Sequence, residues 1–108
     1  MLYELRVYNV SVGRMPDLLK RFDQTTIPIW KRHGFKVVGF WTTMIGESNN
    51  HLHYMLGWDS LADREQKWAA FQADQEWITK RAETEKNGPL VASFSNSILT
   101  PTAFSAMK

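Results

Sequence analysis

The spacing of apolar residues changes repeatedly along this chain, and the order of those changes leaves few folds open. Residues 2–10 alternate apolar and polar side chains, which is typical of a strand. From Met15 to His33, apolar residues recur at three- and four-residue steps, as on one face of a helix, and Pro28 predicts a kink near Thr25 to Ile27. Two runs rich in β-branched and aromatic residues follow, over residues 35–45 and up to Trp58, and predict a hairpin.

The second half of the sequence predicts a pair of helices and a last strand. Ser60-x-x-Asp63 resembles a capping box and predicts a helix through Phe71. Asp74 can cap a shorter helix that ends before Gly88-Pro89. A final strand is expected through Phe94, Asn96 and Ile98. We therefore expect one domain over residues 1–100 and a C-terminal arm over residues 101–108.

The resulting order is strand, helix, strand, strand, helix pair, strand. This order predicts an α+β, ferredoxin-like β-α-β-β-α-β fold, with an antiparallel four-stranded sheet and helices on one face. The strands are apolar on both faces, however, since Phe40 alternates with Trp41 and Tyr54 alternates with Met55. We expect a second copy of the chain to cover the free face, giving a homodimer that pairs through its sheets into an α+β barrel.

Composition excludes several classes of function. The chain has 108 residues, no cysteine and a formal net charge of +2, with basic and acidic residues interspersed, so nucleic acid is not an expected partner. No apolar run is long enough to cross a membrane and the first residues lack the pattern of a secretory signal, which predicts a cytoplasmic location. His51 and His53 have no third ligand beside them, and we predict no metal and no cofactor.

Polar side chains on the first strand are one group of candidate site residues. Glu4, Arg6 and Tyr8 share a strand face, so a guanidinium, a carboxylate and a phenol could converge on a ligand, with Tyr8 moving a proton. The alternative is a structural ion pair, either across the dimer or with a neighbouring strand. His33 is a second candidate for proton transfer, because its ordinary pKa is close to neutrality. Beside Gly34 at a helix end, it is equally suited to compensating the helix dipole.

Aromatic residues form the second group of candidates. Trp41, Tyr54, Trp58 and Trp68 are predicted walls of an apolar ligand cavity. Arg64 lies one helical turn before Trp68 and could reach the mouth of that cavity, where it would hold an anionic group as Arg6 could. The alternative is that these rings only fill the core, because aromatic residues dominate small cores.

An ordered set of short motifs resembles one known family. The motifs are Tyr3-Glu4-Leu5-Arg6-Val7-Tyr8, His33-Gly34, Gly39-Phe40-Trp41, Gly46, Asn50, Arg64 and Ala73-Asp74-x-Glu76-Trp77. Together they resemble the NIPSNAP domain of the dimeric α+β barrel superfamily, over roughly residues 2 to 100. Family members often carry a histidine and a tryptophan after the asparagine of the third strand, where this chain has Tyr54 and Leu56. His53 lies one residue away, on the other strand face, and inherits no role.

The resemblance implies a fold but no particular reaction, because fold alone does not fix function. Relatives in the superfamily include cofactor-independent monooxygenases, haem-degrading proteins and isomerases, which use a cavity between the sheet and the helices of each subunit. We therefore expect a protein that binds, and could transform, a small apolar or aromatic molecule in such a cavity. The alternative is a non-enzymatic module that binds a protein partner or haem.

Overall fold

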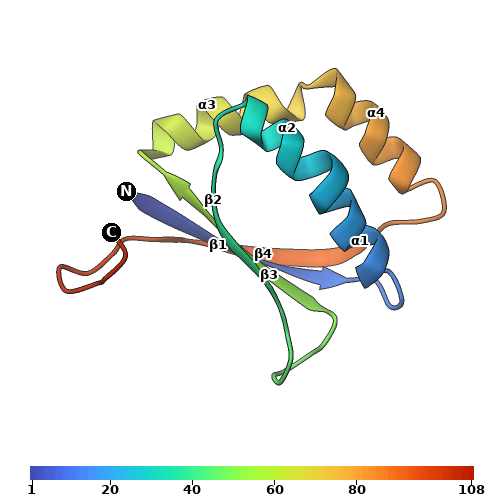
Figure 1. Cartoon of the computed structure of the whole chain (residues 1–108), viewed down its shortest axis with the longest axis horizontal. Coiled ribbons are helices and arrows are strands. Elements are labelled where there is room, and N and C mark those ends of the chain that lie inside the picture. The colour runs from blue at the N-terminus through green and yellow to red at the C-terminus, as the bar shows by residue number, and fades with distance from the viewer.

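The computed structural model describes residues 1–108 and shows a four-stranded antiparallel sheet with all helices on one face (Figure 1). The elements in chain order are β1 (Leu2–Val10), α1 (Met15–Arg21), a π-helical segment η1 (Phe22–Thr26), α2 (Ile27–Arg32), β2 (Lys36–Thr42), β3 (His51–Trp58), α3 (Leu61–Gln72), α4 (Gln75–Thr84) and β4 (Val91–Leu99). The strands lie in the order β2-β3-β1-β4. This confirms the predicted α+β fold and its ferredoxin-like element order.

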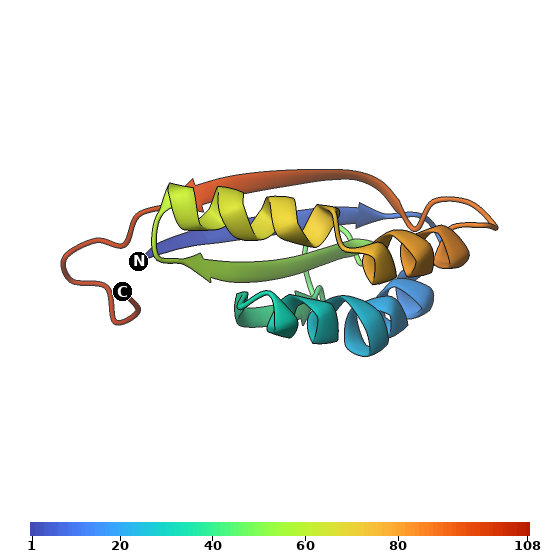
Figure 2. The ribbon, with the colours of Figure 1, turned by 90° about the horizontal axis from the view of Figure 1, so that it is seen from above.

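The helices form a single layer over the sheet. Seen from above, α3 and α4 follow one another along the sheet, and the segment from α1 to α2 runs beside them (Figure 2). None of the helices combines the length and the apolar character that a membrane span needs. The single layer of helices leaves the opposite face of the sheet without any cover from the chain itself.

The first helical segment changes its winding just before Pro28. Residues Phe22–Thr26 are π-helical, and the Ile27 N–H donates to the Phe22 carbonyl, one residue further back than in an α-helix. Pro28, which has no N–H to donate, then occupies the first turn of α2. The interruption expected at residues 25–27 is therefore a π-helical turn, a feature that often accompanies functional sites.

Side-chain caps position the other two helices. The Ser60 hydroxyl accepts a hydrogen bond from the Asp63 N–H at 3.0 Å and begins α3. The Asp63 carboxylate accepts from the Asp59 N–H at 3.1 Å, one residue earlier than in a full capping box. Asp74 begins α4 by accepting from the backbone N–H groups of Glu76 and Trp77.

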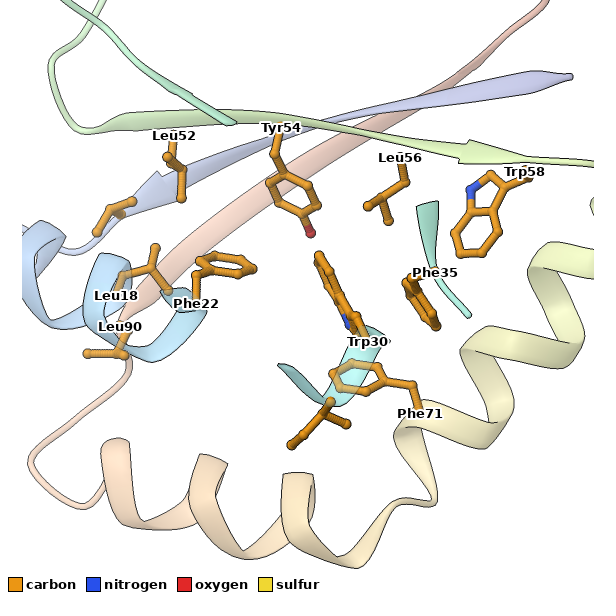
Figure 3. Close-up of a cluster of buried hydrophobic side chains, with 12 residues drawn as sticks. Leu18, Phe22, Trp30, Phe35, Leu52, Tyr54, Leu56, Trp58, Phe71 and Leu90 are labelled. Carbon is orange, nitrogen blue, oxygen red and sulfur yellow. The ribbon is translucent and has the colours of Figure 1, made fainter. Parts of the chain in front are cut away.

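The core lies between the sheet and the helices. Its fully buried side chains from β3 are Leu52, Tyr54, Leu56 and Trp58, and Figure 3 shows them pointing from the strand toward the helices, with Leu52 above Phe22 and Tyr54 above Trp30. The Trp30 ring stacks on the Phe35 ring, with centroids 5.1 Å apart. A β-bulge between Val37 and Gly39 shifts the register of β2, so that Phe40 pairs with Tyr54 and Trp41 pairs with His53. Trp41 therefore points to the uncovered face of the sheet, where it is 51% exposed.

Candidate functional site

A buried carboxylate organises the polar residues beneath the helices. Glu4 has no exposed surface, yet its two oxygens accept five hydrogen bonds. Trp58 Nε1 donates to Oε1 at 3.0 Å, and Arg64 donates through Nε at 2.8 Å and Nη2 at 3.1 Å. Arg6 Nη1 and Asn96 Nδ2 each donate to Oε2 at 3.0 Å. Glu4 thus joins three strands and α3. Its ion pairs are with Arg6 of its own strand and Arg64 of α3, rather than with a neighbouring strand as the sequence alternative had it.

These hydrogen bonds decide the charge of Glu4. Burial by itself raises the pKa of a carboxylic acid, but donation from Arg64, Asn96 and Arg6 outweighs it and lowers the pKa of Glu4 from 4.5 to about 2. Glu4 is therefore ionised at neutral pH and has no free lone pair with which to accept a substrate proton. Its role in this arrangement is to hold two arginine side chains in place.

A pH titration of stability tests this assignment. The pKa of Glu4 is lower in the folded chain than the ordinary value of 4.5. The ionised carboxylate therefore contributes fully to the free energy of unfolding above pH 4.5, and this contribution is lost as the pH falls toward about 2. The expected loss of unfolding free energy over this window is about 3 kcal/mol. Urea unfolding measured through the window should show this loss in the wild type and not in Glu4→Gln. Equal pH dependence in both proteins would contradict the assignment.

A chain of hydrogen bonds leads from Arg6 on β1 to Tyr54 on β3 and back to Tyr8 on β1. Arg6 Nε donates to the Tyr54 hydroxyl at 2.6 Å, and the Tyr54 hydroxyl donates to the Tyr8 hydroxyl at 2.9 Å. Burial raises the pKa of Tyr54 well above its ordinary value, so this phenol remains protonated. The Tyr8 side chain is only partly buried and is the last group of the chain.

Tyr8 borders a large cavity between the sheet and the helices, with a volume of about 970 Å³. Aromatic rings line it from both the sheet and the helices: Tyr8, Phe22, Trp30, Trp68, Phe71, Trp77 and Phe94. Arginine side chains border it as well: Arg6, Arg21, Arg64 and Arg81. The combination of flat apolar walls with a few charged donors is typical of small-molecule sites.

Of the two buried arginines that border this cavity, Arg6 and Arg21, Arg21 has fewer hydrogen-bond and acidic partners to compensate its charge. It is 7% exposed, and its guanidinium lies over the Trp77 ring, with Cζ 5.4 Å from the centroid. Nη1 donates to the Thr84 hydroxyl at 3.2 Å, and the nearest carboxylate oxygen, from Glu85, is 3.7 Å away. Burial lowers the pKa of Arg21, although Glu85 opposes this effect. Arg21 also borders a smaller polar hollow of about 280 Å³ on its other side.

The structure brings together half of the side chains predicted for the site. Arg6, Tyr8, Arg64 and Trp68 border the cavity. Tyr54 and Trp58 have no exposed surface and lie beneath it in the core, where Tyr54 supports Tyr8 and Trp58 donates to Glu4.

The other two predicted residues lie away from the cavity. Trp41 is on the uncovered face of the sheet, because it pairs with His53 across the hairpin. His33 lies at the end of α2, with Nε2 2.8 Å from Asp74 Oδ2. Hydrogen bonds from His33 and Arg32 hold the pKa of Asp74 below its usual range. The contact between His33 and Asp74 also ties the end of α2 to the start of α4. His33 is thus placed to join two helices.

Sequence reasoning did not identify several residues that border the cavity, chiefly Arg21, Trp77, Arg81 and Phe94. Arg21 follows Lys20 in a basic helical stretch and has no local signal of burial. Its burial depends on α4, which packs against η1. Phe94 stood in a predicted strand, and its alternation with Ser93 and Ser95 was the available signal that it faces the helices.

The chain matches the NIPSNAP family model over residues 3–106. The fold is similar to the crystal structure of Atu4242 from Agrobacterium tumefaciens, with 30% identity, full coverage of both chains and a TM-score of 0.87. An uncharacterised NIPSNAP domain protein from Burkholderia xenovorans is 25% identical, over 97% of this chain and 98% of that one, with a TM-score of 0.81. No curated protein matches the chain.

A more distant similarity concerns the fold alone. A variant of MhuD, bound to two manganese protoporphyrin IX molecules per active site, has a TM-score of 0.60. It is 16% identical over 97% of this chain and 98% of that one. The shared feature is the sheet with its layer of helices.

Proposed function

This chain belongs to the NIPSNAP family, and we propose that it binds a small aromatic molecule with an oxygen-bearing or anionic group in the cavity between its sheet and helices. The observation that carries this proposal is the cavity of about 970 Å³, walled by aromatic rings and bordered by arginine side chains. A volume of this size is at the upper end of the range that small-molecule sites usually have. The rings supply apolar contact, and the guanidinium groups supply orientation.

The electrostatics of the cavity favour an anionic or polar ligand over a wholly apolar one. Arg6 lies over the Trp68 ring, with Cζ 4.7 Å from its centroid, and over the Phe94 ring at 4.9 Å. Such pairs keep a charged group beside flat apolar surface, where a ligand can contact both. Arg6 uses only Nε and Nη1 in hydrogen bonds, so part of its guanidinium is free for a ligand.

For a reaction in this cavity, Tyr8 is the group best placed to donate a proton. Glu4 is ionised and saturated with donors, and Glu85 is paired with Arg81 at 3.2 Å. His33 does not border the cavity, so it has no part in the proposed site. An enzyme of this kind would act without a cofactor, as the monooxygenase- or isomerase-like relatives of the superfamily suggest.

A plug in the cavity tests the proposal. Ala82 borders the cavity from α4, whereas Ala70 is an exposed alanine of α3 outside it. Ala82→Trp should weaken binding of the fluorescent probe anilinonaphthalene sulfonate by roughly tenfold or more, because the new indole ring fills the space that the aromatic rings of the probe would occupy. Ala70→Trp should leave the affinity unchanged. Fluorescence titration measures both, and equal affinities in the two variants would overturn the proposal.

We also propose that two chains pair through the uncovered faces of their sheets. Trp41 is 51% exposed there, next to partly buried side chains of β1 and β3 such as Leu5, Val7 and Met55. An exposed tryptophan beside apolar side chains that no other part of the chain covers is typical of an interface. The competing function is docking of a different protein on this face, which the same exposed tryptophan also favours. A measurement of the oligomeric state distinguishes this function from self-association.

A further inference from the structure

Two hydrogen-bond donors that border the cavity have donor capacity left over, and they come from the two layers of the fold. Tyr8 extends from β1, and Arg21 ends α1 directly before Phe22. The Tyr8 and Phe22 rings lie 6.0 Å apart, which brings the end of α1 close to the Tyr8 side chain. Both Tyr8 and Arg21 border the same cavity.

The direction of the hydrogen-bond chain leaves the Tyr8 proton free. Arg6 can only donate, so the Tyr54 hydroxyl accepts from Arg6 Nε. The Tyr54 side chain is fully buried with Tyr8 as its other partner, so its own proton goes to the Tyr8 oxygen. Tyr8 therefore accepts from Tyr54, and its own O–H has no acceptor within the chain. Donation from a guanidinium through a phenol also polarises this O–H and makes it a stronger donor.

Arg21 has the larger surplus of donors. A guanidinium carries five N–H groups, and Arg21 makes a single hydrogen bond, from Nη1 to Thr84. The Glu85 oxygen at 3.7 Å is too distant for a hydrogen bond of ordinary length. A buried charge with so few partners is costly unless another group compensates it. The neighbouring Thr26 hydroxyl is also buried and has no partner.

The charges around the cavity indicate which anion fits. Glu85 is the sole acidic residue at its border, and it contacts both Arg21 and Arg81. One carboxylate shared by two guanidinium groups leaves an excess of one positive charge at this end. A singly charged carboxylate balances that excess, whereas a doubly charged phosphate would exceed it by one negative charge.

We propose that the cavity takes a carboxylate attached to an aromatic ring, and that the Arg21 guanidinium and the Tyr8 hydroxyl hold its two oxygens. The ring then lies among Phe22, Trp77 and Phe94, which surround these two donors. This inference rests on the proposed function and adds to it the chemical class of the ligand and its orientation. It makes Arg21 the residue that distinguishes an acid from a neutral molecule of the same shape.

The test compares naphthoate with naphthyl methanol, a neutral molecule with the same ring, by calorimetry on the full chain. We expect the wild type to bind naphthoate roughly tenfold more tightly or better, as a charge-assisted hydrogen bond provides. Arg21→Met should remove this preference by weakening naphthoate binding roughly tenfold, while the affinity for naphthyl methanol, which carries no charge, falls by a much smaller factor. Tyr8→Phe should lower the affinity for naphthoate by a smaller factor.

Arg32→Met is the matched control, since it removes the same charge from an exposed arginine outside the cavity, paired with Asp74 and Glu76. It should keep the preference for naphthoate. Equal affinities of the wild type for both molecules, or equal weakening of both by Arg21→Met, would overturn the carboxylate assignment and leave the proposed function standing. Failure of the wild type to bind either molecule would overturn the proposed function, and this inference with it.

Discussion

Replacement of Glu4 by glutamine is expected to lower the free energy of unfolding by about 3 to 5 kcal/mol, the usual effect of breaking a buried ion pair. The carboxylate accepts hydrogen bonds from two arginines, a tryptophan and an asparagine that come from separate elements. Glutamine has a similar shape, but its amide nitrogen can only donate, and it therefore opposes one group of donors. Arg6 and Arg64 would both lose their counter-ion.

Urea unfolding of Glu4→Gln beside Glu47→Gln measures this effect. Glu47 is an exposed glutamate between β2 and β3, and its replacement should change stability by no more than about 0.5 kcal/mol. A loss for Glu4→Gln as small as that of the control would mean that the buried cluster does not hold the strands together. The Glu4 cluster would then not hold Arg6 and Arg64, which border the cavity, in a fixed arrangement.

Replacement of Trp41 by aspartate is expected to convert the proposed dimer to monomer. The uncovered sheet face would gain an unpaired charge within the proposed interface, which costs several kcal/mol and raises the dissociation constant by roughly a hundredfold or more. Fold stability should change little, because Trp41 is half exposed and lies outside the core. Size-exclusion chromatography with light scattering measures the mass.

The control for this variant is Val12→Asp, since Val12 is 86% exposed in the turn after β1 and lies outside the sheet. It should leave the mass unchanged. A wild type that is monomeric at high concentration, or a Trp41→Asp variant that remains dimeric, would contradict pairing through the sheets. A monomeric wild type would favour a different protein as the partner of this face.

The periodicity of the sequence was sufficient for the fold because local signals and tertiary packing agree in most elements. Alternation in Leu2–Val10 and the caps at Ser60 and Asp74 describe features that the structure contains. The β-bulge between Val37 and Gly39 was not predicted, although a glycine inside a strand, here Gly39, often marks one. The π-helical turn was only partly predictable, as Pro28 indicates an interruption without its form.

The candidate site was less predictable because charge and burial are properties of packed elements. Glu4 and Arg6 were identified as neighbours on one strand, but the contacts of Glu4 with Arg64 and Asn96 join residues far apart in the sequence. Arg21 is one of two adjacent basic residues at the end of α1, and only the packing of α4 makes it buried. Its unused donors become apparent only when every partner is known.

A crystal structure of the protein with naphthoate tests the central claim most directly. We expect an ordered naphthoate in the cavity of each chain, with its carboxylate at hydrogen-bond distance from Arg21 and Tyr8 and its ring beside Trp77. Naphthoate bound solely outside the cavity, or a cavity closed by the side chains that line it, would contradict a small-molecule site between the sheet and the helices.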